Sequence, residues 1–343
     1  MQFPALDNSR VPLYNGCIIH LRRLFFMKRN HAIDAVRAVA CAFVLFVHAT
    51  FPNPFGLYVA AAARFAVPFF LMVSGYYAFC SEEAGALRVA RRRLVSTAKL
   101  TFIGTLFYAV SNTGRQLLQG QPAFSWLDSL LNPQGLFNFF VYNRAIFLSS
   151  VMYYLFMLLY VYGIFILLIK TRTLKAAYAC IPVLLIACVA LDEFFGQPWY
   201  YSGNFLLTGL PFFLLGHFFA HRPPRLAHPG RLILPGLLLT LVETALFGEA
   251  YCYVGTLMTA IGLFLFCLKV PDVKLPQALV HFGRSCSVTV FIIHCAVRDY
   301  LYMLIPEQPV LLAYARPLAV LAASCALALA LAHIKARKKP MLA

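Results

Sequence analysis

Ten apolar stretches of about 15 to 25 residues follow one another along this chain of 343 residues, and they decide what it can fold into. Hydrophobic residues make up 62% of the sequence and charged residues 12%, which is about half the charged fraction of a soluble domain. In a bilayer each backbone N–H and C=O group needs a partner within the protein, so stretches of this length must form helices. We predict an all-α integral membrane protein with about ten transmembrane helices.

Short polar or basic segments separate the expected spans. The spans cover residues 35–51, 59–79, 94–111, 146–169, 176–191, 205–220, 232–247, 254–268, 288–305 and 310–334. The longest segment between them is 112–143, in which Leu and Phe residues are interrupted by Gln, Asn, Pro and Gly. This pattern is typical of an interfacial or re-entrant segment, and we expect it on the outer side.

The basic residues predict the orientation in the membrane. Ten spans would place 21 of the 29 Lys and Arg on one side, in the segments 22–29, 88–93, 170–175, 222–231, 269–284 and 335–339. The turns on the other side, around Pro52, Asp192, Glu249 and Glu307, are neutral or acidic. Because cytoplasmic loops carry the excess of Lys and Arg, both termini are expected in the cytoplasm. The net charge of +17 therefore reflects topology, and no nucleic-acid partner is expected.

No internal repeat is evident, and we expect one membrane domain with two short flanking segments. The domain covers residues 31–335, preceded by a cytoplasmic segment at 1–30 and followed by a basic cytoplasmic tail at 336–343. The residues before Met27 have no uninterrupted apolar core and no small-residue cleavage site, so they do not form a signal peptide. We expect translation to begin at Met27.

The first span contains three ionisable residues, Asp34, Arg37 and His48. Ionisable groups within a span are presumed functional. The eleven-residue step from Arg37 to His48 makes three turns and roughly 20°, so both side chains lie on one helix face about 16 Å apart. The alternatives are an Arg37 that snorkels to the cytoplasm and a His48 that hydrogen bonds to a neighbouring helix.

Four motifs resemble one known family. They are Asp34 and Arg37 followed after ten residues by His48, then Arg64 with VPFFLMVSGYY at 67–77, LTGLPFFLLGHFF at 207–219 and FGRSCSVTVFIIHC at 282–295. Together they resemble the membrane-bound acyltransferase family 3. The resemblance covers the chain from Met27 onward, but it weakens at 143–147, where the sequence is NRAIF. Contacts to the acceptor from that region are therefore not expected.

The resemblance implies a bacterial inner-membrane enzyme that takes an acyl group from cytoplasmic acyl-CoA, with acetyl-CoA as the expected donor. Arg37 would hold a phosphate of the donor by charge-assisted hydrogen bonds, and Asp34 would orient Arg37. His48 would act as a general base on an acceptor hydroxyl, and Arg64 would stabilise the oxyanion. The alternative for Arg64 is an anchor at the outer interface.

Ser74 and Tyr76, in the same resemblance, are expected to border the donor pocket. Ser74 with Gly75 could instead form a close-packing patch, and Tyr76 with Tyr77 an aromatic belt at the inner interface.

Three further polar residues are expected to contact the acceptor, a carbohydrate or glycolipid. His294 matches a family histidine, Glu243 stands alone in the seventh span, and Arg298 lies about one turn beyond His294. Each has a structural alternative: a hydrogen bond to a neighbouring helix for His294 and Glu243, and a local ion pair with Asp299 for Arg298. Five other histidines are expected at cytoplasmic boundaries as surface or interfacial residues: His217, His221, His228, His281 and His333.

The ten cysteines are scattered singly and show no spacing typical of a metal site, so neither a disulfide framework nor a metal is expected. The oligomeric state is open. A function of another class also remains, a transporter of a polysaccharide or lipid-linked intermediate whose path is lined by Arg and His. The sequence shows neither the repeat symmetry nor the paired broken helices of many transporters.

Overall fold

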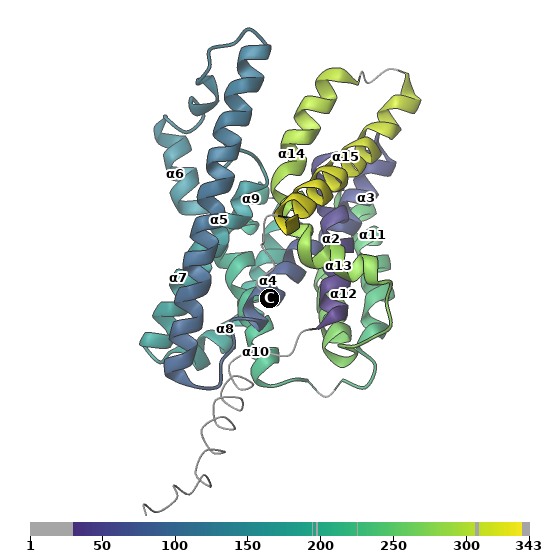
Figure 1. Cartoon of the computed structure of the whole chain (residues 1–343). Coiled ribbons are helices and arrows are strands. Elements are labelled where there is room, and N and C mark those ends of the chain that lie inside the picture. Colours follow the sequence, from purple (N-terminus) through teal and green to yellow (C-terminus); the bar gives the residue numbers. More distant parts are fainter. Residues whose placement is uncertain (1–29, 194, 197, 225, 306–308, 338–343) are drawn as a thin grey trace, which may run out of the picture.

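The computed structural model describes residues 30–193, 195–196, 198–224, 226–305 and 309–337 as an assembly of helices (Figure 1). Within these residues, eight helices are long and apolar enough to cross a membrane, and two shorter apolar helices accompany them. The predicted all-α membrane class is confirmed. The number of spans and the domain boundaries remain predictions. Met27 and most of the expected terminal segments lie outside the described residues.

Every expected span coincides with helical structure. The long helices are α2 (His31–His48), α3 (Phe55–Ala63) with α4 (Ala66–Tyr76), α5 (Glu83–Leu118), α7 (Met152–Lys170), α8 (Leu174–Glu193), α11 (Ile233–Phe247), α14 (Ser287–Leu304) and α15 (Val310–Arg337). The shorter apolar ones are α10 (Leu210–His221), preceded by a π-helical turn, η3 (Phe205–Gly209), and α12 (Val254–Lys269). The remaining elements are η2 (Ser125–Leu127), α6 (Pro133–Tyr142), α9 (Trp199–Ser202), η4 (Pro229–Leu232) and α13 (Gln277–Ser285).

The expected second span, 59–79, is not one helix. It is interrupted at Arg64 and Phe65, between α3 and α4. Pro68 explains the break, since it has no N–H to donate to the carbonyl of Arg64 four residues earlier. The break places Arg64 at the junction of two helices instead of inside one.

α5 is much longer than the expected span 94–111. Its 36 residues give a length of about 54 Å, whereas the hydrocarbon core of a bilayer is about 30 Å thick. The expected outer segment 112–143 therefore begins inside α5, and it also contains α6. Phe139 of α6 packs on Phe147 and on Phe156 of α7, at ring-centroid distances of 5.4 and 5.0 Å.

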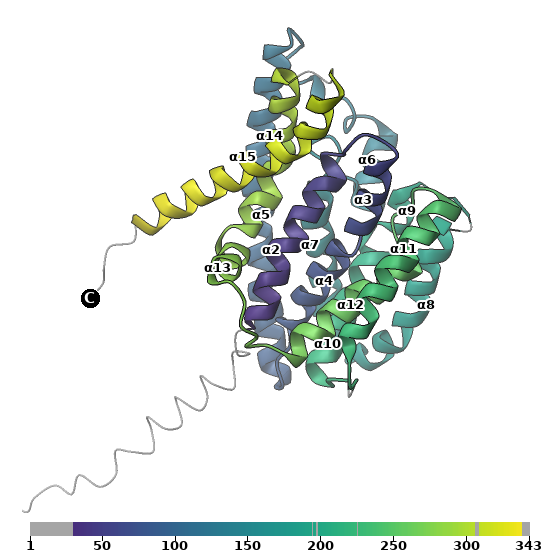
Figure 2. The same cartoon turned by 90° about the vertical axis from the view of Figure 1, so that its right-hand side faces the viewer.

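α13 is a short amphipathic helix within a segment expected to be a basic loop. It packs directly on α2, and the two lie side by side in Figure 2. A Cβ on Gly283 would lie 1.7 Å from the carbonyl oxygen of Asp34, so only glycine permits this approach. α13 therefore covers the part of α2 that carries Asp34 and Arg37.

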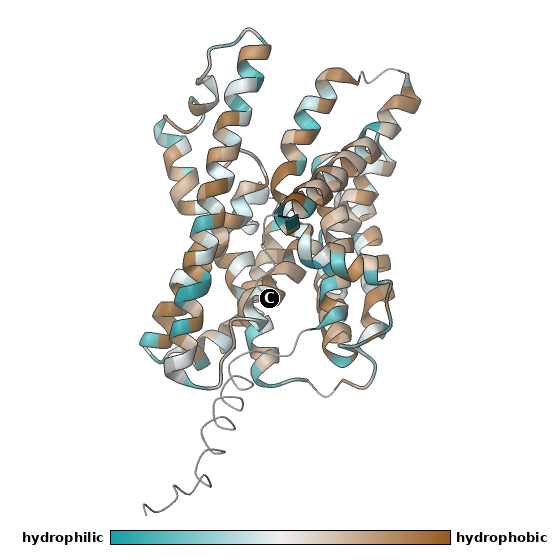
Figure 3. Ribbon diagram, viewed as in Figure 1, coloured by the Kyte–Doolittle hydropathy of each residue, from teal (hydrophilic) through white to brown (hydrophobic). Residues whose placement is uncertain are grey.

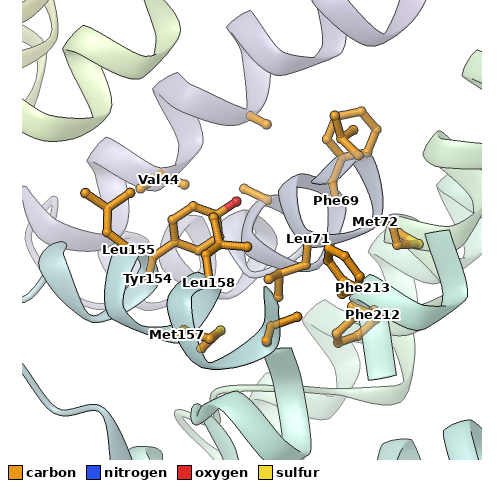
Figure 4. Close-up of a cluster of buried hydrophobic side chains, with 14 of the residues drawn as sticks. Val44, Phe69, Leu71, Met72, Tyr154, Leu155, Met157, Leu158, Phe212 and Phe213 are labelled. Carbon is orange, nitrogen blue, oxygen red and sulfur yellow. The ribbon is translucent and has the colours of Figure 1, made fainter. Parts of the chain in front are cut away.

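The core lies between α2, α4, α7 and α10. Figure 4 shows side chains from these helices in contact, among them Val44, Leu71, Leu158 and Phe213. By contrast, apolar side chains of α5, α8, α11 and α15 are exposed at the outside of the bundle, where lipid would cover them (Figure 3).

The turns that follow α4, α7 and α10 gather at one end of the bundle, and those that follow α5 and α14 at the other (Figure 1). The basic segments 88–93, 170–175 and 222–231 belong to the first end. This agrees with the predicted charge asymmetry, while the side that faces the cytoplasm remains a prediction.

The close crossing of α4 and α10 should make Gly216 intolerant of a side chain. A Cβ there would lie 2.0 Å from the carbonyl oxygen of Met72, so we expect Gly216→Ala to destabilise the fold by about 1 to 3 kcal/mol through overpacking. A thermal-stability measurement on the detergent-solubilised protein checks this. Gly163→Ala is the control, since nothing lies within 4 Å of a Cβ at Gly163. Equal melting temperatures for the two variants would contradict the packing.

Candidate functional site

Two helices, α2 and α14, run side by side in the same direction and hold the polar residues of the first span between them. At one end Arg37 Nη2 lies 3.3 Å from Ser287 Oγ, and at the other Arg298 Nη1 donates to the carbonyl oxygen of His48 at 2.9 Å. In each of the two pairs the partners are 250 residues apart in sequence. The two helices therefore keep the same register over the three turns between the pairs. The shared face predicted for Arg37 and His48 is the face that meets α14.

At the first end of this helix pair, Arg37 has two polar neighbours. Its Nη1 lies 3.5 Å from Asp34 Oδ1, as expected for a carboxylate one turn away. Ser287 donates its own hydroxyl to the carbonyl oxygen of Gly283 in α13, at 2.6 Å. Asp34 is buried, whereas the Arg37 side chain keeps 22% of its surface exposed. The guanidinium is therefore oriented and still accessible to a ligand.

At the other end, His48 lies against side chains from other segments. Its Nδ1 lies 3.1 Å from Ser150 Oγ, just before α7, and its ring is 5.3 Å from the ring of His294. Ser150 Oγ is also 3.8 Å from Cys295 Sγ. His294 and Cys295 are buried, whereas His48 is only partly buried. These side chains form a compact cluster around His48.

Arg298 fixes the end of α2. Besides donating to His48, it pairs with Asp299, with Nε and Nη2 at 2.8 and 2.6 Å from Oδ1. The ion pair was the structural alternative for Arg298. The bond to the His48 carbonyl is an additional contact that joins α14 to the residue at the centre of the cluster.

Arg64 lies near enough for its charge to act on the His48 ring, but its ion pair is with Glu249, at 2.9 Å. The guanidinium also lies over the ring of Tyr251, 5.7 Å from its centroid. Burial raises the pKa of Tyr251 well above its usual range, so its hydroxyl stays protonated and hydrogen bonds with Tyr153. Within the described part of the chain, the buried Nε–H of Arg64 has no hydrogen-bond partner.

The structure gives Ser74 and Tyr76 packing roles. Ser74 donates to the carbonyl oxygen of Phe70 in its own helix, and the Tyr76 ring packs on Phe264 of α12. Next to them, Gly75 lies against the α10 backbone, where a Cβ would be 1.9 Å from the carbonyl oxygen of Phe213. This arrangement agrees with the close-packing alternative for Ser74 and Gly75. Contacts of Ser74 and Tyr76 with the acyl donor remain predictions, and no distance among the described residues supports them.

Glu243 is not brought into the His48 cluster. It accepts a hydrogen bond from the backbone N–H of Gly255, at 2.9 Å, in the contact between α11 and α12. Glu243 therefore makes the hydrogen bond to a neighbouring helix that was the structural alternative for it. Its contact with an acceptor remains a prediction.

His217 is not a surface residue as expected. It is buried, and its Nδ1 lies 2.6 Å from the hydroxyl of Tyr178. The other histidines placed at the surface are exposed: His221, His228, His281 and His333.

Sequence reasoning missed Ser150 and Cys295. Neither belongs to a pattern with His48, since 102 residues separate Ser150 from it and Cys295 lies in another helix. The position of Cys295 next to His294 was the one available signal. Only the packing of α2 against α14 brings these side chains together.

A groove of about 890 Å³ lies on the outside of the bundle, and no residue of the His48 cluster lines it. It runs between α5, α14 and α15, and Ala296, which follows Cys295, is part of its wall. Its other walls are mostly apolar, with Ile103 and Phe107 from α5 and Leu327 from α15. Such a surface suits a hydrocarbon chain.

The comparison with protein families gives one match. A family model described as an acyltransferase domain, of acyltransferase family 3, matches residues 30–336. No curated protein and no solved structure matches this chain.

Replacing Arg298 should loosen the last turn of α2. Arg298→Met removes a charged donor from the His48 carbonyl, and hydrogen bonds to charged groups contribute about 1.5 to 3 kcal/mol. We therefore expect backbone amides at 44–51 to exchange hydrogen at least about tenfold faster, as measured by mass spectrometry. The control is Arg144→Met, because Arg144 packs on the ring of Tyr200 elsewhere. Unchanged exchange in Arg298→Met would show that this bond does not hold α2.

Proposed function

Because the chain belongs to acyltransferase family 3, we propose that it is a membrane O-acyltransferase whose active centre is His48. It would move an acyl group, in the first instance acetyl, from cytoplasmic acyl-CoA to a hydroxyl of an envelope glycan or glycolipid in the bacterial inner membrane. The observation that carries the proposal is the α2–α14 pair, with Arg37 and His48 on one face about 16 Å apart.

Arg37 is the proposed anchor for the donor. Its planar guanidinium suits a phosphate of coenzyme A, and Asp34 and Ser287 hold it in place from two helices. The acyl-pantetheine arm would then extend along α2 toward His48. Cys41 and Val44 lie on the intervening face and are buried, so the arm would have to displace packing around them.

His48 is the proposed general base. It takes the proton from the acceptor hydroxyl while the oxygen attacks the thioester carbonyl carbon, and a tetrahedral oxyanion forms. The oxyanion then collapses, the C–S bond breaks, and the coenzyme A thiolate leaves with the proton that the His48 imidazolium returns. Base and acid are thus one residue, and the products are the ester and free coenzyme A.

Ser150 sets the tautomer of His48 in this scheme. With the Nδ1–H donating to Ser150 Oγ, the Nε2 lone pair is free to accept the proton. Ser150 is therefore a positioning residue.

Arg64 is the proposed stabiliser of the oxyanion. Arg298 already uses one N–H on each of its three nitrogens for Asp299 and the His48 carbonyl. Arg64 has a buried Nε–H without a partner among the described residues, and its charge acts on His48. A free donor and a positive charge beside the base are what a developing oxyanion requires.

A glycolipid acceptor is favoured over a free glycan by the groove between α5, α14 and α15. Its apolar walls include Ala296, the residue after Cys295, and they could hold the hydrocarbon part of the acceptor while the sugar hydroxyl extends toward His48. Membership of an acyltransferase family disfavours the transporter alternative.

Radiolabelled acetyl-CoA on the cytoplasmic face of oriented membrane vesicles tests the proposal. We expect wild type to transfer label into a glycan or lipid fraction, and His48→Ala at matched protein level to transfer at least about 100-fold less, because it lacks the base. His333→Ala, which changes an exposed histidine of α15, is the control and should match wild type.

Equal transfer by wild type and His48→Ala would remove His48 as the base. If that variant kept its transfer but no longer moved unmodified glycan across the membrane, the transporter alternative would replace the proposal.

A further inference from the structure

We propose that His48, His294 and Cys295 bind a soft divalent metal ion such as Zn²⁺, and that the bound ion blocks acyl transfer. The inhibitory part rests on the proposed role of His48 as the base. The site lies between α2 and α14, beside Ser150.

The three side chains already converge. One potential ligand atom from each lies within 4.8 Å of the others. Zn²⁺ bound to nitrogen and sulfur at about 2.0 to 2.3 Å places its tetrahedral ligands about 3.3 to 3.8 Å apart. Small side-chain rotations would close the difference. Imidazole nitrogen and thiolate sulfur are both ligands that Zn²⁺ binds in proteins, and three protein ligands leave a fourth position open.

The imidazole of His294 has the arrangement of a metal ligand. Its Nδ1 lies 3.0 Å from the carbonyl oxygen of Val290, which sets Nδ1 as the donor and leaves the lone pair on Nε2. His294 is 1% exposed, and within the described residues its Nε2 has no hydrogen-bond partner. A buried lone pair without a partner is unfavourable, and a cation at this position would satisfy it.

The fourth ligand position of a tetrahedral ion and the charge of the surrounding side chains are also compatible with a bound cation. Ser150 Oγ lies 3.1 Å from His48 Nδ1 and 3.8 Å from Cys295 Sγ, so an oxygen is already beside two of the three ligands. Cys295 would bind as the thiolate and release its proton to solvent as the metal–sulfur bond forms. The positive charge of Arg298 is offset by Asp299, 2.6 Å away.

Binding would inhibit the enzyme for a simple reason. The lone pair of His48 that coordinates the ion is the one that must accept the proton of the acceptor hydroxyl. Cys295 contributes to the metal site and has no part in the proposed reaction. Metal binding and acyl transfer can therefore be separated by substitution at Cys295.

The first experiment adds Co²⁺ to the purified full chain in detergent, without acyl-CoA. We expect one equivalent of Co²⁺ to produce the near-ultraviolet charge-transfer absorption of a cobalt–thiolate bond. Cys295→Ala should lose this absorption, and Cys295→Ser serves the same purpose if the alanine variant does not fold. Cys267→Ala, which changes a buried cysteine of α12, should retain it. The same absorption in the Cys295 variants, or none in wild type, would overturn the metal site.

The second experiment measures inhibition of acyl transfer by Zn²⁺. We expect Cys295→Ala to remain active without metal and to need at least about tenfold more Zn²⁺ for half inhibition than wild type, since a ligand is lost. Equal inhibition of both would overturn the link between the site and the block. The cobalt spectrum does not depend on transfer, so the metal site is judged separately if the proposed acyltransferase activity fails.

Discussion

The structure depends on the pairing of α2 with α14. A helix that carries Asp34, Arg37 and His48 through a membrane leaves polar groups that lipid cannot satisfy, and an unsatisfied group there costs several kcal/mol. α14 meets α2 at both ends in one register, through Ser287 at Arg37 and Arg298 at the His48 carbonyl, while Asp34 pairs with Arg37 and Ser150 bonds the His48 ring. The same pairing that makes the helix tolerable in lipid also creates a polar face inside an apolar protein, and this face is where chemistry can occur.

Other elements adjust to this pair. α13 lies on the inner half of α2 because Gly283 leaves room at Asp34, and it ties Ser287 in place. The break between α3 and α4 brings Arg64 near the outer half, and the turn before α7 contributes Ser150. In the proposed function, binding of the donor and transfer of the acyl group would take place at opposite ends of one helix pair.

Hydropathy and helical periodicity were sufficient to predict the helical membrane class and the common face of Arg37 and His48. They did not show the break at Arg64, although Pro68 was a visible signal, since a proline within a helix removes a backbone donor. α13 was hidden in a basic loop because a short amphipathic helix carries few apolar residues. Ser150 carried no signal in the sequence and Cys295 only its position next to His294, because the proximity of both to His48 is a property of tertiary packing.

The central claim is that one helix face holds the donor at Arg37 and its acyl group at His48. A structure of the protein bound to a non-hydrolysable acyl-CoA analogue tests this most directly. The account predicts a phosphate in hydrogen-bond contact with Arg37 and the acyl carbonyl beside His48, with the arm running along α2. An analogue bound with its acyl group away from His48 would contradict the account.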